Sequence, residues 1–188
     1  MKNLAVLLLW SLASCGRTEK SSEMDAARSK SARDAFESWV KAAVGGDAAK
    51  TFAMLSDGNK SGWLYDRLEE GDASARRWRG ELTGTTRTEL DLWWGVAKQR
   101  SSGRDEPLPS SVLLHPSLAQ LFGEYFVRTE IGIRVQMSRL QIAQIYGDDS
   151  GVTVAVRNGV GATELYGMIY ERDGWKIDAH RQPLSQSK

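Results

Sequence analysis

The chain changes its hydrophobic period once, from a helical spacing in the first two thirds to a strand-like alternation near the end. The clearest helical run has apolar or semi-polar residues at three- and four-residue intervals from Leu118 to Thr129. Pro116 stands just before this run and Gly132 just after it. This pattern predicts a long amphipathic helix that starts near Pro116 and stops at Gly132.

Three shorter helices are predicted earlier in the chain. Residues 32–45 have apolar side chains at helical spacing and run into a Gly-Gly pair, which is typical of a helix C-terminus. Asp47 follows at an N-cap position and predicts a short second helix that reaches about residue 56. A third helix is expected over residues 62–70, with Gly71 as its stop.

The middle of the chain, residues 72–111, has the weakest pattern. An LDLWWG patch favours a helix over about residues 87–100, and a loop rich in Gly, Ser and Pro follows it. Tryptophans concentrate in and beside this stretch, either as the packing of a helical cap, which we prefer, or as an aromatic site for a ligand or partner. They are Trp63, Trp78, Trp93 and Trp94.

The last part of the chain alternates as strands do. Four runs rich in Val, Ile, Tyr and Trp cover residues 138–146, 151–157, 163–171 and 174–179, and the turn sequences GDDSG, NGVGA and RDG separate them. Such short turns predict an antiparallel meander. Alternation places Val152, Val154 and Val156 on one face of their strand, and Tyr166, Met168 and Tyr170 on one face of the next.

The fold class expected from these elements is α+β. N-terminal helices and a long helix would pack on a curved antiparallel sheet, with a helical or irregular insertion in the middle. Residues 1–14 are interpreted as a signal peptide, residues 15–31 as a polar tether whose later part can join the first helix, residues 32–180 as one domain, and residues 181–188 as a polar tail.

The N-terminus carries a targeting signal. Residues 4–13 form an apolar run behind Lys2 that is too short to span a hydrocarbon core of ~30 Å, so it reads as a signal-peptide segment. LASC at residues 12–15 resembles the bacterial lipobox, which implies acylation of Cys15 and export to the cell envelope. Gly16 at the following position resembles outer-membrane sorting more than inner-membrane retention, where two membranes exist. Two alternatives stay open: ordinary cleavage after the small residues Ser11 and Ala13, which would release a soluble protein, or an incidental thiol in a discarded leader.

Charge and composition exclude several classes of function. The chain has 25 Lys and Arg against 24 Asp and Glu, and Lys2 is the one charged residue among the first 14, so the remainder is formally neutral. Such a balance offers no net attraction for nucleic acid. Cys15 is the single cysteine, so no intramolecular disulfide can form. His115 and His180 are the two histidines and lie far apart in sequence, which disfavours a metal site; no cofactor is expected.

The order of the elements resembles the NTF2-like superfamily, which includes SnoaL-like and ketosteroid-isomerase-like proteins. The residues that carry this resemblance are Trp39 in the first helix, the GGD break after it, the long helix, and DGWKID at residues 173–178. It implies a bent sheet that wraps around the long helix as a cone with a pocket at its open end. The first two strands usual in that superfamily have no counterpart in the middle segment, which is either an insertion or a helical cap over the pocket.

Catalysis of the isomerase type requires an acidic base in an apolar pocket near a hydrogen-bond donor. Tyr65 with Asp66, and Tyr170 with Asp178, are the candidate pairs, although we prefer the interpretation that the tyrosines are half-buried and the acids are surface charges. The Arg-rich stretch at residues 76–79 could hold an anion, but nearby acids favour an ion-paired, solvated helix end.

The expected function is therefore that of a membrane-anchored, non-catalytic lipoprotein that binds a small apolar ligand or an envelope protein. An isomerase or dehydratase with an acid–tyrosine dyad in the cone, and a purely structural envelope component, are the alternatives. Besides membrane lipid at Cys15, the candidate ligand or partner surface consists of Trp78, Trp93, Trp94, Tyr166, Met168 and Tyr170.

Overall fold

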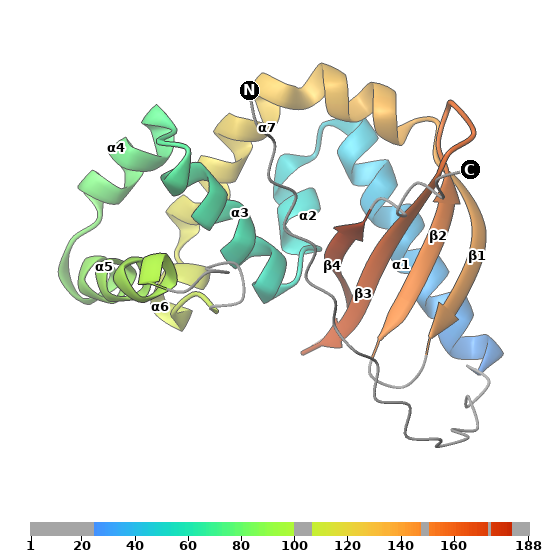
Figure 1. Cartoon of the computed structure of the whole chain (residues 1–188), viewed down its shortest axis with the longest axis horizontal. Coiled ribbons are helices and arrows are strands. Elements are labelled where there is room, and N and C mark those ends of the chain that lie inside the picture. Colours follow the sequence, from blue (N-terminus) through green and yellow to red (C-terminus); the bar gives the residue numbers. More distant parts are fainter. Residues whose placement is uncertain (1–24, 100–106, 148–150, 173, 182–188) are drawn as a thin grey trace, which may run out of the picture.

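The computed structural model describes residues 25–99, 107–147, 151–172 and 174–181, so the lipobox and the C-terminal tail lie outside the described residues. The described chain is α+β, with helices followed by a four-stranded antiparallel sheet (Figure 1). The helices are α1 (Ala26–Gly45), α2 (Ala48–Ala53), α3 (Asp57–Glu69), α4 (Ala73–Glu81), α5 (Gly84–Gln99), α6 (Ser110–Leu113) and α7 (Pro116–Met137). The strands are β1 (Gln141–Gly147), β2 (Val152–Arg157), β3 (Thr163–Glu171) and β4 (Gly174–Arg181).

The first two helices begin and end as their capping residues predict. Gly46 adopts the left-handed conformation (φ 78°) that closes α1, and the Asp47 carboxylate accepts a hydrogen bond of 2.9 Å from the Lys50 backbone N–H to start α2. Helix α1 begins at Ala26, so it includes the last part of the segment interpreted as a tether.

The predicted helix boundaries that differ most from the structure are the start of α3 and the end of α7. Helix α3 starts at Asp57 instead of residue 62, because Ser56 is its N-cap and accepts a hydrogen bond of 2.9 Å from the Asn59 backbone N–H. Helix α7 continues through Gly132 to Met137. A single glycine costs a helix only about 1 kcal/mol, and Met137 recovers this by packing against the core.

The predicted meander is confirmed, with strand order β1-β2-β3-β4. Val154 pairs with Tyr166 and Val156 with Glu164, and these side chains are buried on the same face of the sheet. The register of β3 against β4 shifts between Gly167 and Met168. Strand β1 is one edge of the sheet.

Helix α1, rather than the long helix α7, covers the sheet. The rings of Phe36 and Trp39 on α1 lie 5.2 Å and 5.7 Å from the ring of Tyr166 on β3. Helix α7 packs mainly on α1, α2 and α4. The expectation that the long helix lies on the sheet therefore fails, because the apolar stripe of α1 already occupies that face.

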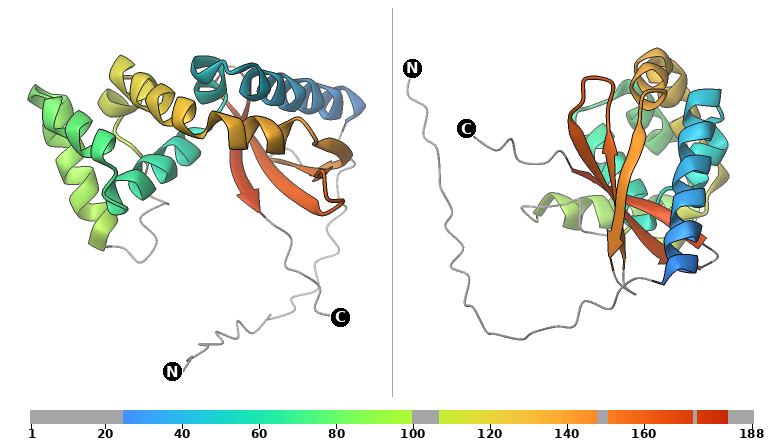
Figure 2. Two further views of the ribbon diagram at one scale, coloured as in Figure 1. Left: turned by 90° about the horizontal axis from the view of Figure 1, so that it is seen from above. Right: turned by 90° about the vertical axis from the view of Figure 1, so that its right-hand side faces the viewer.

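Every described element of the middle segment is a helix, and its described residues contain no strand. Helices α4, α5 and α6 form, with α3 and the start of α7, a helical part that lies beside the sheet and not over it (Figures 1 and 2). Of the two possibilities for this segment, an insertion or a helical cap over the pocket, its position beside the sheet favours the insertion.

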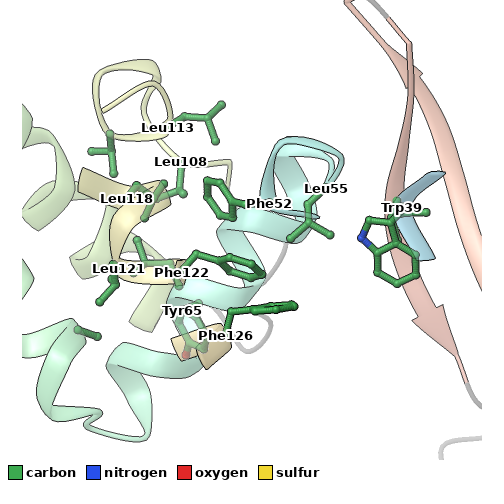
Figure 3. Close-up of a cluster of buried hydrophobic side chains, with 14 of the residues drawn as sticks. Trp39, Phe52, Leu55, Tyr65, Leu108, Leu113, Leu118, Leu121, Phe122 and Phe126 are labelled. Carbon is green, nitrogen blue, oxygen red and sulfur yellow. The ribbon is translucent and has the colours of Figure 1, made fainter. Parts of the chain in front are cut away.

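One hydrophobic core joins the helical part to the sheet. Phe52 of α2 packs on Phe122 of α7, with ring centroids 4.9 Å apart, and Figure 3 shows these rings between the helical part and Trp39. Strand β4 is attached to the same region by backbone bonds from Ile177 N–H to the Met54 carbonyl (2.9 Å) and from Ser56 N–H to the Ile177 carbonyl (2.8 Å).

Candidate functional site: an apolar groove beside the first strand

An open groove of about 410 Å³ lies between α1, the end of α7 and the start of β1. Its floor and walls are apolar, whereas charged residues of α1 form one rim. The apolar lining residues are Phe36, Val40, Val44, Met137, Leu140 and Ile142, and the rim residues are Arg33, Glu37 and Lys41.

The groove follows from helical periodicity. Phe36, Val40 and Val44 are four residues apart, so they form one stripe along α1. The opposite wall exists because α7 continues past Gly132 and ends with Met137, after which the chain bends into β1. The Leu140 backbone N–H bonds to the Met137 carbonyl (3.2 Å) in this bend, which directs the chain along α1.

The rim has a small positive excess. Arg33, Glu37 and Lys41 are also four residues apart and are exposed. A guanidinium nitrogen of Arg33 lies 3.8 Å from a carboxylate oxygen of Glu37, so these two charges offset each other. Lys41, one turn farther along, adds one positive charge at the groove mouth.

A buried acid–tyrosine pair lies behind the groove floor. The Tyr166 hydroxyl donates a hydrogen bond of 3.0 Å to Glu164 Oε2, and Asn158 Nδ2 donates one of 2.8 Å to Glu164 Oε1. Burial, and then the neighbouring Glu164 carboxylate, raise the pKa of Tyr166, so its hydroxyl stays protonated. The ring of Phe36 covers Tyr166, and neither Glu164 nor Tyr166 lines the groove.

The tyrosines and one acid of the two pairs named from the sequence contact other residues. The Tyr65 hydroxyl lies 3.5 Å from Glu69 Oε1, one turn along α3. Tyr170 lies opposite Trp175 in the sheet, with ring centroids 5.5 Å apart. Asp178 instead accepts a hydrogen bond of 2.7 Å from the Ser56 hydroxyl.

The six residues proposed as a ligand or partner surface do not form one surface. Trp78, Trp93 and Trp94 are buried in the helical part, which supports their interpretation as packing. Tyr166 is buried against Phe36 and Trp39 of α1 and Met168 is also buried, whereas Tyr170 is 59% exposed at the end of β3. Their separation follows from the helical insertion, which carries the tryptophans away from the sheet.

His115 and the arginines near Trp78 have local roles. His115 Nδ1 accepts a hydrogen bond of 3.3 Å from Ser117 N–H and caps α7, as its place before Pro116 predicts. Arg77 and Arg79 form ion pairs with Glu124 (3.3 Å) and Asp91 (2.7 Å), so the ion-paired interpretation of this stretch is confirmed for them. The side chain of His180 lies outside the described residues.

A second polar cluster joins the sheet to the start of α3. Glu171 accepts a hydrogen bond from the Asp57 backbone N–H (3.2 Å), and Arg172 bonds to the Asp57 carboxylate (2.7 Å). Burial raises the pKa of Glu171, and the nearby carboxylates of Asp57 and Asp178 add to this increase. These contacts fix β3 and β4 against α3 and leave the carboxylates engaged within the fold.

Neither a metal centre nor a membrane span is found in the described part of the chain. No group of three or more His, Cys, Asp or Glu side chains there is placed to hold a metal ion. Among the described helices, none combines the length and the apolar character needed to cross a membrane.

Comparison of the chain with protein-family models, curated proteins and solved structures finds no match. The site therefore rests on geometry. Sequence reasoning missed the groove as a unit because its second wall depends on the extension of α7 past Gly132. The one sign of the groove in the sequence is that Val40 and Val44 continue the four-residue spacing of Phe36 along α1.

Proposed function

We propose that this chain is an exported lipoprotein, anchored through an acylated Cys15, whose domain binds a small apolar molecule in the groove between α1 and β1. The LASC sequence at residues 12–15 supports the anchor. Two or more acyl chains hold a protein stably on a membrane, so no transmembrane helix is needed. The tether then keeps the groove close to the membrane surface.

We also propose a distant NTF2-like architecture for the domain. The order of helices before an antiparallel meander supports it, as do Trp39 under the sheet and Trp175 in the last strand. The position of α7 beside the sheet and the helical insertion are departures from that architecture. A cavity lined by the first helix and the sheet edge would be this chain's counterpart of the pocket.

The groove is the observation that carries the proposed function. Its volume of about 410 Å³ lies within the range of ligand sites, and its lining combines an apolar floor with a few charged groups at the mouth. The acid that lines it, Glu37, is exposed and paired with Arg33, so the groove offers a binding surface rather than a buried base.

Native mass spectrometry of the chain from Gly16 onward tests the ligand. We expect a retained mass above that of the polypeptide, lost in Val44→Arg, which places a charge in the groove. Val96→Arg, at an exposed apolar position of α5, is the matched control and should keep the added mass. Retention by both variants would place the ligand elsewhere, and a bare parent chain would favour a structural envelope role.

A separate experiment tests the anchor. The full-length chain with Cys15→Ser should leave the membrane fraction, whereas the parent should remain there after a high-salt wash, because acyl chains and not surface charges hold it. Equal membrane retention of the variant and the parent would reject acylation of Cys15 as the anchor.

A further inference from the structure

We infer that the groove ligand is a linear acyl chain with an anionic head group. This inference rests on the proposed function, since it names the ligand class of the same groove.

The shape of the groove suits a linear hydrocarbon. Val40 and Val44 are partly exposed one turn apart on α1, next to the buried Phe36 ring, and Met137, Leu140 and Ile142 lie opposite them, so the lining follows the helix axis. Apart from Phe36 the apolar lining is aliphatic or thioether, and Phe36 is only 1% exposed, so no aromatic face is available for stacking a ring. Van der Waals contact with a flexible chain is what these side chains can provide.

Uncharged polar side chains are scarce along the groove lining. Ser138 is the polar lining residue between the walls, and its hydroxyl donates a hydrogen bond of 3.2 Å to the Val135 carbonyl at the end of α7. A ligand with polar groups along its length would leave them unpaired against this floor, which is costly. The polar part of the ligand must therefore remain at the mouth.

The rim selects the sign of the head group. Two basic residues, Arg33 and Lys41, flank one acid, Glu37, so the charges of the lining residues sum to +1; Asp34 and Asp47 lie on the far side of Lys41, away from the groove lining. These side chains are exposed, and an exposed ion pair contributes a two- to fivefold effect on affinity at most, about the size of a surface salt bridge. Charge therefore orients the ligand, and the apolar chain supplies the affinity.

Isothermal titration of the chain from Gly16 onward tests this assignment; this chain keeps every described residue of the core. The probes are monomeric n-alkanoates of increasing length and the matching n-alkanols. We expect affinity to rise about threefold to fourfold per added methylene until the groove is filled. Alkanoates should bind about two- to fivefold more tightly than alkanols of equal length.

Variants assign the two contributions. Lys41→Glu should remove the preference for alkanoates, whereas Lys50→Glu, an exposed lysine on α2 outside the groove lining, should retain it. Val44→Arg should abolish binding of both series. An equal effect of Lys41→Glu and Lys50→Glu, or no preference for the anionic series, would overturn the head-group assignment.

Two further arms separate this inference from the proposed function. If a compact apolar dye binds and no alkanoate displaces it, the acyl-chain assignment is rejected, but an apolar ligand site remains. Failure of the dye and of both series would reject the ligand-binding function as well. If monomeric lysophosphatidylglycerol binds more tightly than alkanoates of equal acyl length, the ligand is a phospholipid. The reverse order of affinity identifies a free fatty acid.

Discussion

At the scale of single residues, hydrogen bonds of Trp78, Ser117 and His115 connect helices of the helical part. The indole N–H of Trp78 donates a hydrogen bond of 2.8 Å to Ser117 Oγ, and Ser117 Oγ lies 2.6 Å from His115 Nδ1. This chain of contacts joins α4 to the first turn of α7. It also explains why Trp78 belongs to the core and not to a ligand surface, since its one polar atom is already bonded inside the fold.

Ser117→Ala should destabilise the protein by about 1–3 kcal/mol, because it leaves the buried indole N–H of Trp78 without an acceptor. Urea denaturation followed by far-UV circular dichroism measures this change. Ser31→Ala, at an exposed position of α1, is the matched control and should alter stability by less than about 0.5 kcal/mol. A Ser117→Ala variant as stable as the control would show that this hydrogen bond contributes nothing.

Helix ends are the feature that decides structure at the element scale. Local capping signals predict where α1 and α2 meet and where the strands turn, because a residue such as Asp47 or Gly46 acts on its own neighbours. Neighbouring residues do not determine where α7 ends. Gly132 weakens a helix by itself, but Met137 gains from packing on distant parts of the chain, and no local pattern contains that contribution.

The same distinction explains what the sequence predicts about the site. The apolar stripe of α1 is visible from its spacing, whereas its partners Met137 and Leu140 are known only once the path of α7 is known. The tryptophans illustrate the reverse case. Their concentration in the middle segment is visible in the sequence, but only the packing of α4 and α5 shows that Trp78, Trp93 and Trp94 face inward.

Asp72 provides a test of capping at the start of α4. Its carboxylate accepts hydrogen bonds from the backbone N–H groups of Ser74 (2.9 Å) and Ala75 (3.0 Å) and lies 3.3 Å from Arg128 of α7. Burial acts to raise the pKa of Asp72, but these hydrogen bonds and the Arg128 charge outweigh it and hold the pKa below the usual value. A depressed pKa means that the ionised form stabilises the fold.

Asp72→Ala should therefore cost about 1 kcal/mol at pH 7. Asp72→Asn keeps an acceptor for the cap but removes the charge, so it should lower the free energy of unfolding by less than Asp72→Ala does. This loss of stability relative to the parent should shrink as the pH falls from the unfolded-state pKa of Asp through the lower folded-state value. Urea midpoints at pH 7 and pH 3 measure both. Arg128→Gln, which removes one cause of the depressed pKa, should reduce the pH-dependent part; a deficit of Asp72→Asn that stays constant with pH would contradict this account.

At the scale of the whole molecule, two parts share one core. The sheet with α1 and the helical part from α3 to α6 lie side by side, and α2 and α7 connect them (Figure 2). Phe52 is at this junction, where its ring lies 4.9 Å from Phe122 and 6.3 Å from Trp63. A continuous core of this kind makes the two parts depend on each other, so they should unfold as one cooperative unit.

Hydrogen exchange at increasing urea concentration tests that dependence. Peptides from β2 and β3 and peptides from α5 should lose protection at the same urea concentration, because neither part buries its apolar side chains without the junction. Phe52→Ala should lower the free energy of unfolding by about 3–5 kcal/mol. It should shift both sets of peptides together if the junction couples them. Loss of protection in α5 well before β2 would instead show that the helical insertion is an independent unit attached to the domain that carries the groove.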